Sequence, residues 1–165
     1  MEKYAVKKLN KKNNINASVP GSKSITNRAL MLAAMSDGIC TLNGVLFSSD
    51  SRAFLDCLIS LGFSVQIDEE SANVVIKGEN GRIPNRKATI NVQSAGTAAR
   101  FMTVFLAVAG GDYTFQSSEQ MKKRPMSELL GSLTAKGVEI KCLEEEGHFP
   151  FEIHSKGIKS GNIKI

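Results

Sequence analysis

The chain has 165 residues, 42% of them hydrophobic, which is enough to bury one sizeable core. Its net charge of +5 favours an anionic partner and leaves nucleic acid, membrane surfaces and phosphorylated small molecules open. The longest apolar run, residues 101–109, is far shorter than the ~20 residues that cross a bilayer. The three cysteines form no CxxC pair, which favours reduced thiols in a cytosolic protein over a disulfide framework or a metal site.

Helical and strand-like patterns alternate along the chain, which predicts an α/β fold. We expect helices at 24–35, 51–61, 96–109 and 125–136. We expect strands at 15–19, 40–44, 64–67, 73–77, 88–92, 113–116, 139–142 and 151–154. In chain order these elements read β-α-β-α-β-β, and then the same order again.

Matching residues support this internal repeat. Leu58 and Gly62 of the first unit correspond in position to Leu133 and Gly137 of the second. The final stretch "KSGNIKI" looks like the first strand of a third unit, and units that bury apolar faces on one another often need at least three copies. We therefore expect repeat one at about 19–80, repeat two at about 85–158 and the start of repeat three at about 159–165.

The first helix start, "PGSKSITNR", places positive charge where the helix dipole is already positive. Gly21 permits a tight turn, and Lys23 and Arg28 stand beside free backbone N–H groups and the hydroxyls of neighbouring Ser and Thr residues. This combination predicts an anion site. A solvated basic cap is the alternative. The spacing excludes a Walker A loop, in which Gly directly precedes Lys.

The other three helix starts serve as a comparison. The second, "SSDSRAF", offers conventional caps and an acidic first turn. The third, "QSAGTAARF", combines the hydroxyl of Ser94 with Gly96, whose N–H an anion can approach closely. Taken alone, this start is better explained by a glycine turn with a Ser or Thr cap. The fourth, "EQMKKRPMSELL", places Arg124 before Pro125, which fits the first helical position, while its two lysines fit a solvated face.

At these residues a family resemblance becomes specific. "PGSKSITNRALMLAA", "SAGTAARF" and "MKKRPMSELL" resemble the N-terminal third of the 5-enolpyruvylshikimate-3-phosphate synthase family, from about Ile15 to the end of the chain. The resemblance implies two domains of three βαβαββ units each, with helices inside and sheets outside. It implies that 19–165 is an incomplete substrate domain and that 1–18 pairs with the other domain.

The resemblance also implies an activity. Members transfer the enolpyruvyl group of phosphoenolpyruvate to the 5-hydroxyl of shikimate-3-phosphate and release phosphate, as cytoplasmic monomers without a metal or organic cofactor. Carried over to this chain, Lys23 contacts both substrates and is the catalytic residue, and Ser24 and Arg28 hold shikimate-3-phosphate. Gly96 and Arg124 hold phosphoenolpyruvate, and Ser94 stands where many members have Asn.

The sequence offers no convincing general acid or base, and two other functions stay open. Glu144, Glu145 and Glu146 read as a solvated hairpin loop, and His148 and His154 lack partners for a triad or a metal site. The sister UDP-N-acetylglucosamine enolpyruvyl transferases share the fold but carry Lys-Asn at the first motif. A phosphate-binding or nucleic-acid-binding module fits the basic charge, although the chain shows no groove-reading or base-stacking signature.

Overall fold

The computed structural model describes residues 20–158 and 160–161. Within them the elements follow one another as α1 (Lys23–Met35), β1 (Asp37–Asn43), α2 (Ser49–Ser60), β2 (Val65–Asp68), β3 (Asn73–Glu79), β4 (Lys87–Asn91), α3 (Gly96–Ala109), β5 (Gly111–Gln116), α4 (Glu119–Lys122), α5 (Ser127–Thr134), β6 (Glu139–Cys142) and β7 (Phe151–Ser155). The strand expected at 15–19, and all but two residues of the expected start of a third unit, lie outside this range.

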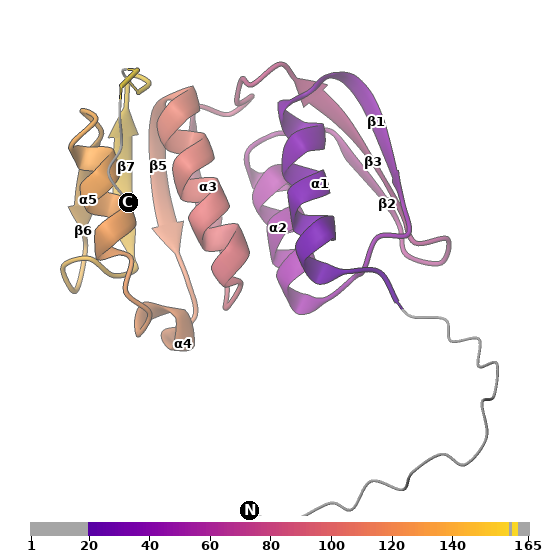
Figure 1. Ribbon diagram of the computed structural model, residues 1–165, viewed down its shortest axis with the longest axis horizontal. Coiled ribbons are helices and arrows are strands. Elements are labelled where there is room, and N and C mark those ends of the chain that lie inside the picture. Colours follow the sequence, from indigo (N-terminus) through magenta and orange to yellow (C-terminus); the bar gives the residue numbers. More distant parts are fainter. Residues whose placement is uncertain (1–19, 159, 162–165) are drawn as a thin grey trace, which may run out of the picture.

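The strands form two sheets with helices between them, as Figure 1 shows. The first sheet has the order β1-β3-β2 and is antiparallel throughout. The second has the order β4-β5-β7-β6, in which β4 runs parallel to β5 and the other pairs are antiparallel. α1 packs on β3 and on α2, and α2 also packs on β4 and α3 of the second unit. The expected α/β class is confirmed, and within the described residues the first unit shows the order α-β-α-β-β, because its expected first strand lies outside them.

The two units end their second helices in the same way, which supports the repeat. After α2, the Phe63 amide donates to the Leu58 carbonyl (3.1 Å) across Gly62, whose φ is 85°. After α5, the Val138 amide donates to the Leu133 carbonyl (3.2 Å) across Gly137, whose φ is 90°. Both turns need a left-handed residue, which glycine adopts without the penalty of a Cβ. The correspondence predicted from sequence is therefore present in the backbone.

Followed along the chain, the longer helices all run in the same direction. α1, α2, α3 and α5 all begin at the same end of the molecule, the lower end in Figure 1. The positive ends of their dipoles therefore gather on one side of the fold. No helix in the described part of the chain has the length and apolar character needed to span a membrane.

The fourth predicted helix differs from the structure. A short helix, α4, precedes it, and α5 begins at Ser127 rather than at Pro125. The Met126 amide donates to the Gly147 carbonyl (2.8 Å), and its side chain is buried, so Met126 anchors the helix entry to the β6–β7 loop. Pro125 therefore lies outside the helix, in the linker between α4 and α5.

The core depends on one close approach between α1 and β3. Gly78 in β3 lies so near the end of α1 that a Cβ on it would meet the Ala33 carbonyl oxygen at 2.6 Å and the Ser36 carbonyl oxygen closer still. Both atoms belong to backbone, which cannot rotate away. The absence of a side chain at this position therefore sets the distance between helix and sheet.

Replacing Gly78 with alanine is expected to force α1 away from β3. Because overpacking of this kind typically costs 1–3 kcal/mol, we expect G78A to lower the free energy of unfolding by about 3 kcal/mol in urea titrations. Gly131 in α5 is the control, since a Cβ there would meet nothing within 4 Å. G131A is expected to stabilise the chain by about 0.5–1 kcal/mol, and equal effects of the two substitutions would contradict the packing argument.

Candidate active site

The start of α1 combines a capped helix with a half-exposed cation. Ser22 is the N-cap, and its hydroxyl accepts the Ile25 amide (3.4 Å). Lys23, the first helical residue, has a side chain that is 52% exposed. Thr26 is not a ligand donor as the motif suggested, because it is buried and its hydroxyl oxygen accepts the Leu46 amide (3.2 Å). That bond ties α1 to the loop before α2.

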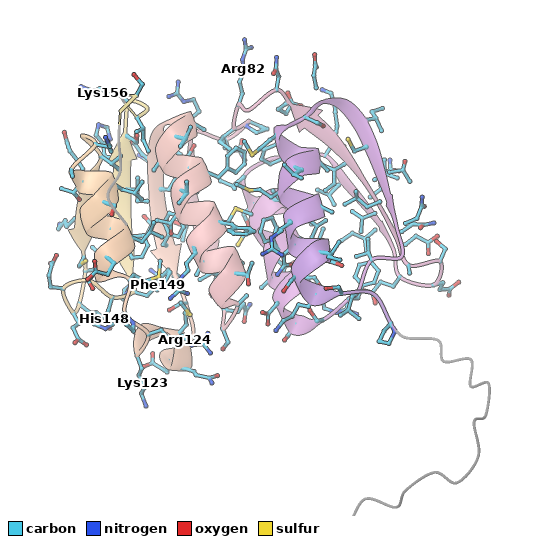
Figure 2. All side chains as sticks on the ribbon, viewed as in Figure 1. Arg82, Lys123, Arg124, His148, Phe149 and Lys156 are labelled. Carbon is cyan, nitrogen blue, oxygen red and sulfur yellow. The ribbon has the colours of Figure 1, made fainter. Side chains whose placement is uncertain are left out.

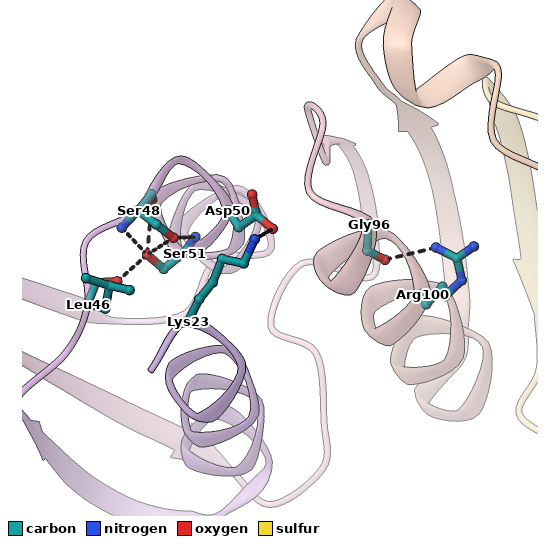
Figure 3. Close-up of polar contacts among 7 residues, drawn as sticks. All are labelled: Lys23, Leu46, Ser48, Asp50, Ser51, Gly96 and Arg100. Carbon is teal, nitrogen blue, oxygen red and sulfur yellow. Dashed lines mark hydrogen bonds and ion pairs between the residues drawn. The ribbon is translucent and has the colours of Figure 1, made fainter. Parts of the chain in front are cut away.

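Lys23 reaches across to the start of α2. Its Nζ lies 3.2 Å from Oδ2 of Asp50, whose side chain is 19% exposed, as Figure 3 shows. Asp50 stands in the first turn of α2, where a negative charge also complements the helix dipole. The sequence explained Asp50 by that dipole alone. The structure adds that this carboxylate holds the lysine across the α1–α2 junction.

The start of α2 is complete in itself. Ser48 caps the helix, its hydroxyl accepting the Ser51 amide (3.3 Å), and the Ser51 hydroxyl accepts the Ser48 amide (2.8 Å) in return. This reciprocal capping box satisfies the first amides of the helix without a ligand. The interpretation of "SSDSRAF" as a conventional helix start is confirmed.

The start of α3 lacks such a cap. Its N-cap is Ala95, whose side chain makes no capping hydrogen bond, so neither a Ser nor a Thr caps this helix. A Cβ on Gly96 would lie 2.9 Å from Nη1 of Arg124 and 3.4 Å from Nη1 of Arg100. The missing side chain therefore leaves room for two guanidinium groups against the helix start. Uncapped amides beside two arginines are a setting for an anionic group.

Arg100 lies one turn inside α3, as expected from the sequence, although it was not assigned to a substrate. Its Nη1 donates to the Gly96 carbonyl oxygen (3.3 Å), one turn back along α3, as Figure 3 shows. Its spacing of four residues from Gly96 on a predicted helix was the available signal. Arg28 behaves in the same way on α1, where its Nη1 donates to the Ser24 carbonyl oxygen (3.5 Å).

Ser94 lies in a cleft between the α2 start and the loop before α3. The cleft has a volume of about 360 Å³, and both Asp50 and Ser94 line it. The Ser94 hydroxyl lies 2.7 Å from the Ser118 hydroxyl, and Ser118 caps α4. Ser94 therefore shares one cleft with the carboxylate that holds Lys23.

The fourth cluster divides into a paired lysine and two free cations. Lys122 pairs with Glu144 and Glu119, and hydrogen bonds to these carboxylates raise its pKa. Its ion pair with Glu144 links α4 to the β6–β7 loop. Lys123 and Arg124 are exposed at the lower end of the molecule in Figure 2, and in the part of the chain that the structure describes neither forms an ion pair.

The predicted site residues thus fall into two groups. Ser94, Gly96 and Arg124 come together around the α3 start. Lys23, Ser24 and Arg28 lie within the first two turns of α1, and Arg28 borders the groove between α1 and α3. Lys23 pairs with Asp50, which lines the same cleft as Ser94. Because the cations of both groups are exposed, water screens each contact that they make with an anion.

Other reactive side chains lie elsewhere. The His154 ring contacts the Asp112 carboxylate, and both lie exposed on the outer face of the second sheet, where the pair forms neither a triad nor a metal site. Burial raises the pKa of the Cys57 thiol to about 12, which leaves it a neutral core residue. All three cysteines are free, and the described residues contain no group of three or more side chains able to hold a metal ion.

Removing the Asp50 charge is expected to release Lys23. Because the carboxylate competes with any anion for the ammonium, we expect D50N to bind inorganic phosphate about threefold more tightly, measured by NMR titration. The chain is expected to lose about 0.5 kcal/mol of stability with the charge at the α2 start. Asp56 lines the same cleft without pairing with Lys23, so D56N should leave phosphate binding within the error. A weaker phosphate complex in D50N would contradict the competition.

Comparisons with known proteins agree on one family. The family model of EPSP synthase (3-phosphoshikimate 1-carboxyvinyltransferase) matches residues 9–165. The 3-phosphoshikimate 1-carboxyvinyltransferase of Trichormus variabilis is 36% identical over 165 residues, covering all of this chain and 39% of that protein. The corresponding protein of Opitutus terrae is 42% identical over 151 residues, covering 90% of this chain and 35% of that one.

Solved structures give the same answer. The EPSP synthase of Acinetobacter baumannii superposes with a TM-score of 0.77 at 25% identity, covering 85% of this chain and 32% of that one. The chain therefore spans about a third to two fifths of the proteins it matches. With a family model that matches nearly its whole length, the chain belongs to the EPSP synthase family.

Proposed function

We propose that this chain forms part of the substrate site of an enzyme that transfers the enolpyruvyl group of phosphoenolpyruvate to the 5-hydroxyl of shikimate-3-phosphate and releases phosphate. One observation carries the proposal beyond family membership. The uncapped α3 start, with Gly96 between Arg100 and Arg124, opens at the same end of the molecule as Lys23. The substrates carry phosphate and carboxylate groups, which such helix starts bind.

Each substrate is assigned to one of the two groups of residues. Phosphoenolpyruvate lies at the α3 start, held by the Gly96 amide, Arg124 and Ser94. Shikimate-3-phosphate lies along the first two turns of α1, held by Ser24 and Arg28. Lys23 stands between them, and its exposed ammonium exchanges the Asp50 carboxylate for substrate oxygen atoms.

The reaction proceeds by addition and elimination in this proposal. The alkene carbon of phosphoenolpyruvate takes up a proton, and the 5-hydroxyl gives up its own proton as its oxygen attacks the neighbouring carbon to give a tetrahedral ketal phosphate. That intermediate then loses a proton and its phosphate. Lys23 stabilises the negative charge of the intermediate and of the departing phosphate, because a fixed ammonium needs no reorganisation as charge develops. The groups that move the protons are proposed to lie in the remaining length of the family proteins.

Turnover measurements test this function directly. A longer family protein carrying this chain is expected to release phosphate only when phosphoenolpyruvate and shikimate-3-phosphate are both present, and the 165-residue chain alone is expected to release none. K23M should lower kcat at least 100-fold, about 3 kcal/mol of transition-state stabilisation. Lys77, exposed and paired with Glu79 on β3, provides the control variant K77M. Full activity of K23M, or UDP-N-acetylglucosamine as the better acceptor, would overturn the assignment.

We propose in addition that the two units belong to a larger domain. α1 and α3 leave an apolar groove of about 430 Å³ between them, lined by Met31, Leu32, Phe101 and Val104, and Leu32 is 66% exposed. A third unit would cover this groove with its own helices, as each described unit already covers the other. Residues 1–18 would then pair with the second domain of the family.

A charge in the groove tests this organisation. L32K is expected to change the stability of the 165-residue chain by less than 0.5 kcal/mol, because Leu32 is exposed there. In a longer family protein the same charge would be buried, and we expect a loss of about 2 kcal/mol or more in urea unfolding. Ile39, 75% exposed on the outer face of β1, is the control, since I39K should change neither protein. Equal effects of L32K in both lengths would refute a covering unit.

We infer that the protein acts in the cytoplasm as a monomer on small molecules, without nucleic acid or membrane. The free cysteines support a reducing compartment. Sedimentation of a longer family protein checks the monomeric state, and a salt-sensitive complex with DNA or RNA would contradict this inference.

A further inference from the structure

A pair of hydroxyl groups joins the two segments that carry the phosphoenolpyruvate ligands. Ser94 lies two residues before Gly96, and its Oγ is 2.7 Å from Oγ of Ser118. Ser118 begins the α4 segment that leads to Arg124. The Ser118 amide also donates to the Gln93 carbonyl oxygen (3.1 Å), so Ser118 contacts the loop before α3 through both backbone and side chain.

The contact between the two hydroxyls can run in either direction, and a bound anion selects one of them. The Ser118 Oγ already accepts the Met121 amide (3.3 Å) as the cap of α4. If Ser94 also donated to it, the Ser118 proton would have no acceptor among the described residues. If Ser118 donates to Ser94, the oxygen and the proton of the Ser118 hydroxyl both have a partner, and the Ser94 proton is free to donate to a ligand. A phosphate or carboxylate can only accept, so a bound anion selects the chain from Ser118 to Ser94 to the anion.

The same contact fixes the position of Arg124. Met121, whose amide Ser118 caps, is fully buried, and the Arg124 amide donates to the Met121 carbonyl oxygen (3.0 Å). Arg124 then lies against Gly96, where a Cβ would meet its Nη1 at 2.9 Å. Ser118 is thus the point at which the α4 segment is held to the α3 start, on the side where the guanidinium and the free amides face one ligand.

We infer that Ser118 is a positioning residue for phosphoenolpyruvate, which orients the Ser94 hydroxyl toward the substrate and holds Arg124 beside Gly96. This inference rests on the proposed function. Ser118 does not touch the substrate, and Ser94 and Arg124 act on it directly. The shikimate-3-phosphate residues on α1 lie on another element, so their ligand is not affected.

The test is a mutant cycle on the 165-residue chain, with phosphoenolpyruvate and shikimate-3-phosphate titrated separately by NMR. We expect S118A and S94A each to weaken phosphoenolpyruvate binding about fivefold to tenfold, and the double variant to be no weaker than either single variant. S118T, which keeps the hydroxyl, should restore binding to within twofold of wild type. Shikimate-3-phosphate binding should change by less than twofold throughout.

Ser117 supplies the matched control, because its hydroxyl donates to the Ser118 carbonyl oxygen (3.2 Å) and does not contact Ser94. S117A should bind phosphoenolpyruvate as wild type does. Unchanged binding in S118A, additive losses in the double variant, or an equal loss for both substrates would overturn the positioning role alone. If wild type shows no saturable phosphoenolpyruvate shifts at Ser94 and Gly96, the proposed function fails and this inference fails with it.

Discussion

The candidate site depends on the common direction of the helices. Each of the longer helices α1, α2, α3 and α5 is followed by a strand, and all four begin at one end of the fold. Free amides and partial positive charges then accumulate there whatever the side chains are. The side chains decide which helix starts have hydrogen-bond acceptors for their first amides. Ser48 and Ser51 cap the start of α2, whereas the start of α3 has no side-chain cap and lies beside two arginines.

Lys23 and Asp50 show how the fold manages charge at this end. A lysine on a helix start is unfavourable for its own helix, and an aspartate on the next start is favourable for that one. Placed 3.2 Å apart, the two charges offset each other across the α1–α2 junction. Their half-exposed geometry keeps the interaction exchangeable, because water and incoming anions compete with it. The ion pair therefore holds Lys23 near the cleft and still allows an anion to replace the Asp50 carboxylate.

Much of this fold was predictable from sequence, and the exceptions have physical causes. α3 was predicted with its observed bounds because its apolar helical period is long, and β6 because a strand alternates every two residues and follows the turn at Gly137. α4 was missed because four residues are too few to show a period. Thr26 was taken for a ligand because a motif does not show which face of a helix is buried. The pairing of Ser94 with Ser118 joins residues distant in sequence, and a pattern along the chain carries no such information.

The open start of α3 has a consequence for how substrate and fold relate. The first amides of α3 have no side-chain acceptor, and a bound anion would accept their hydrogen bonds as the Ser48 hydroxyl does for α2. Such an anion would then serve as a structural part of the fold as well as a ligand. Binding and local folding become one equilibrium, in which the first turn of α3 is firmest when the site is occupied. Specificity for an anion would in that case arise from the same amides that complete the helix.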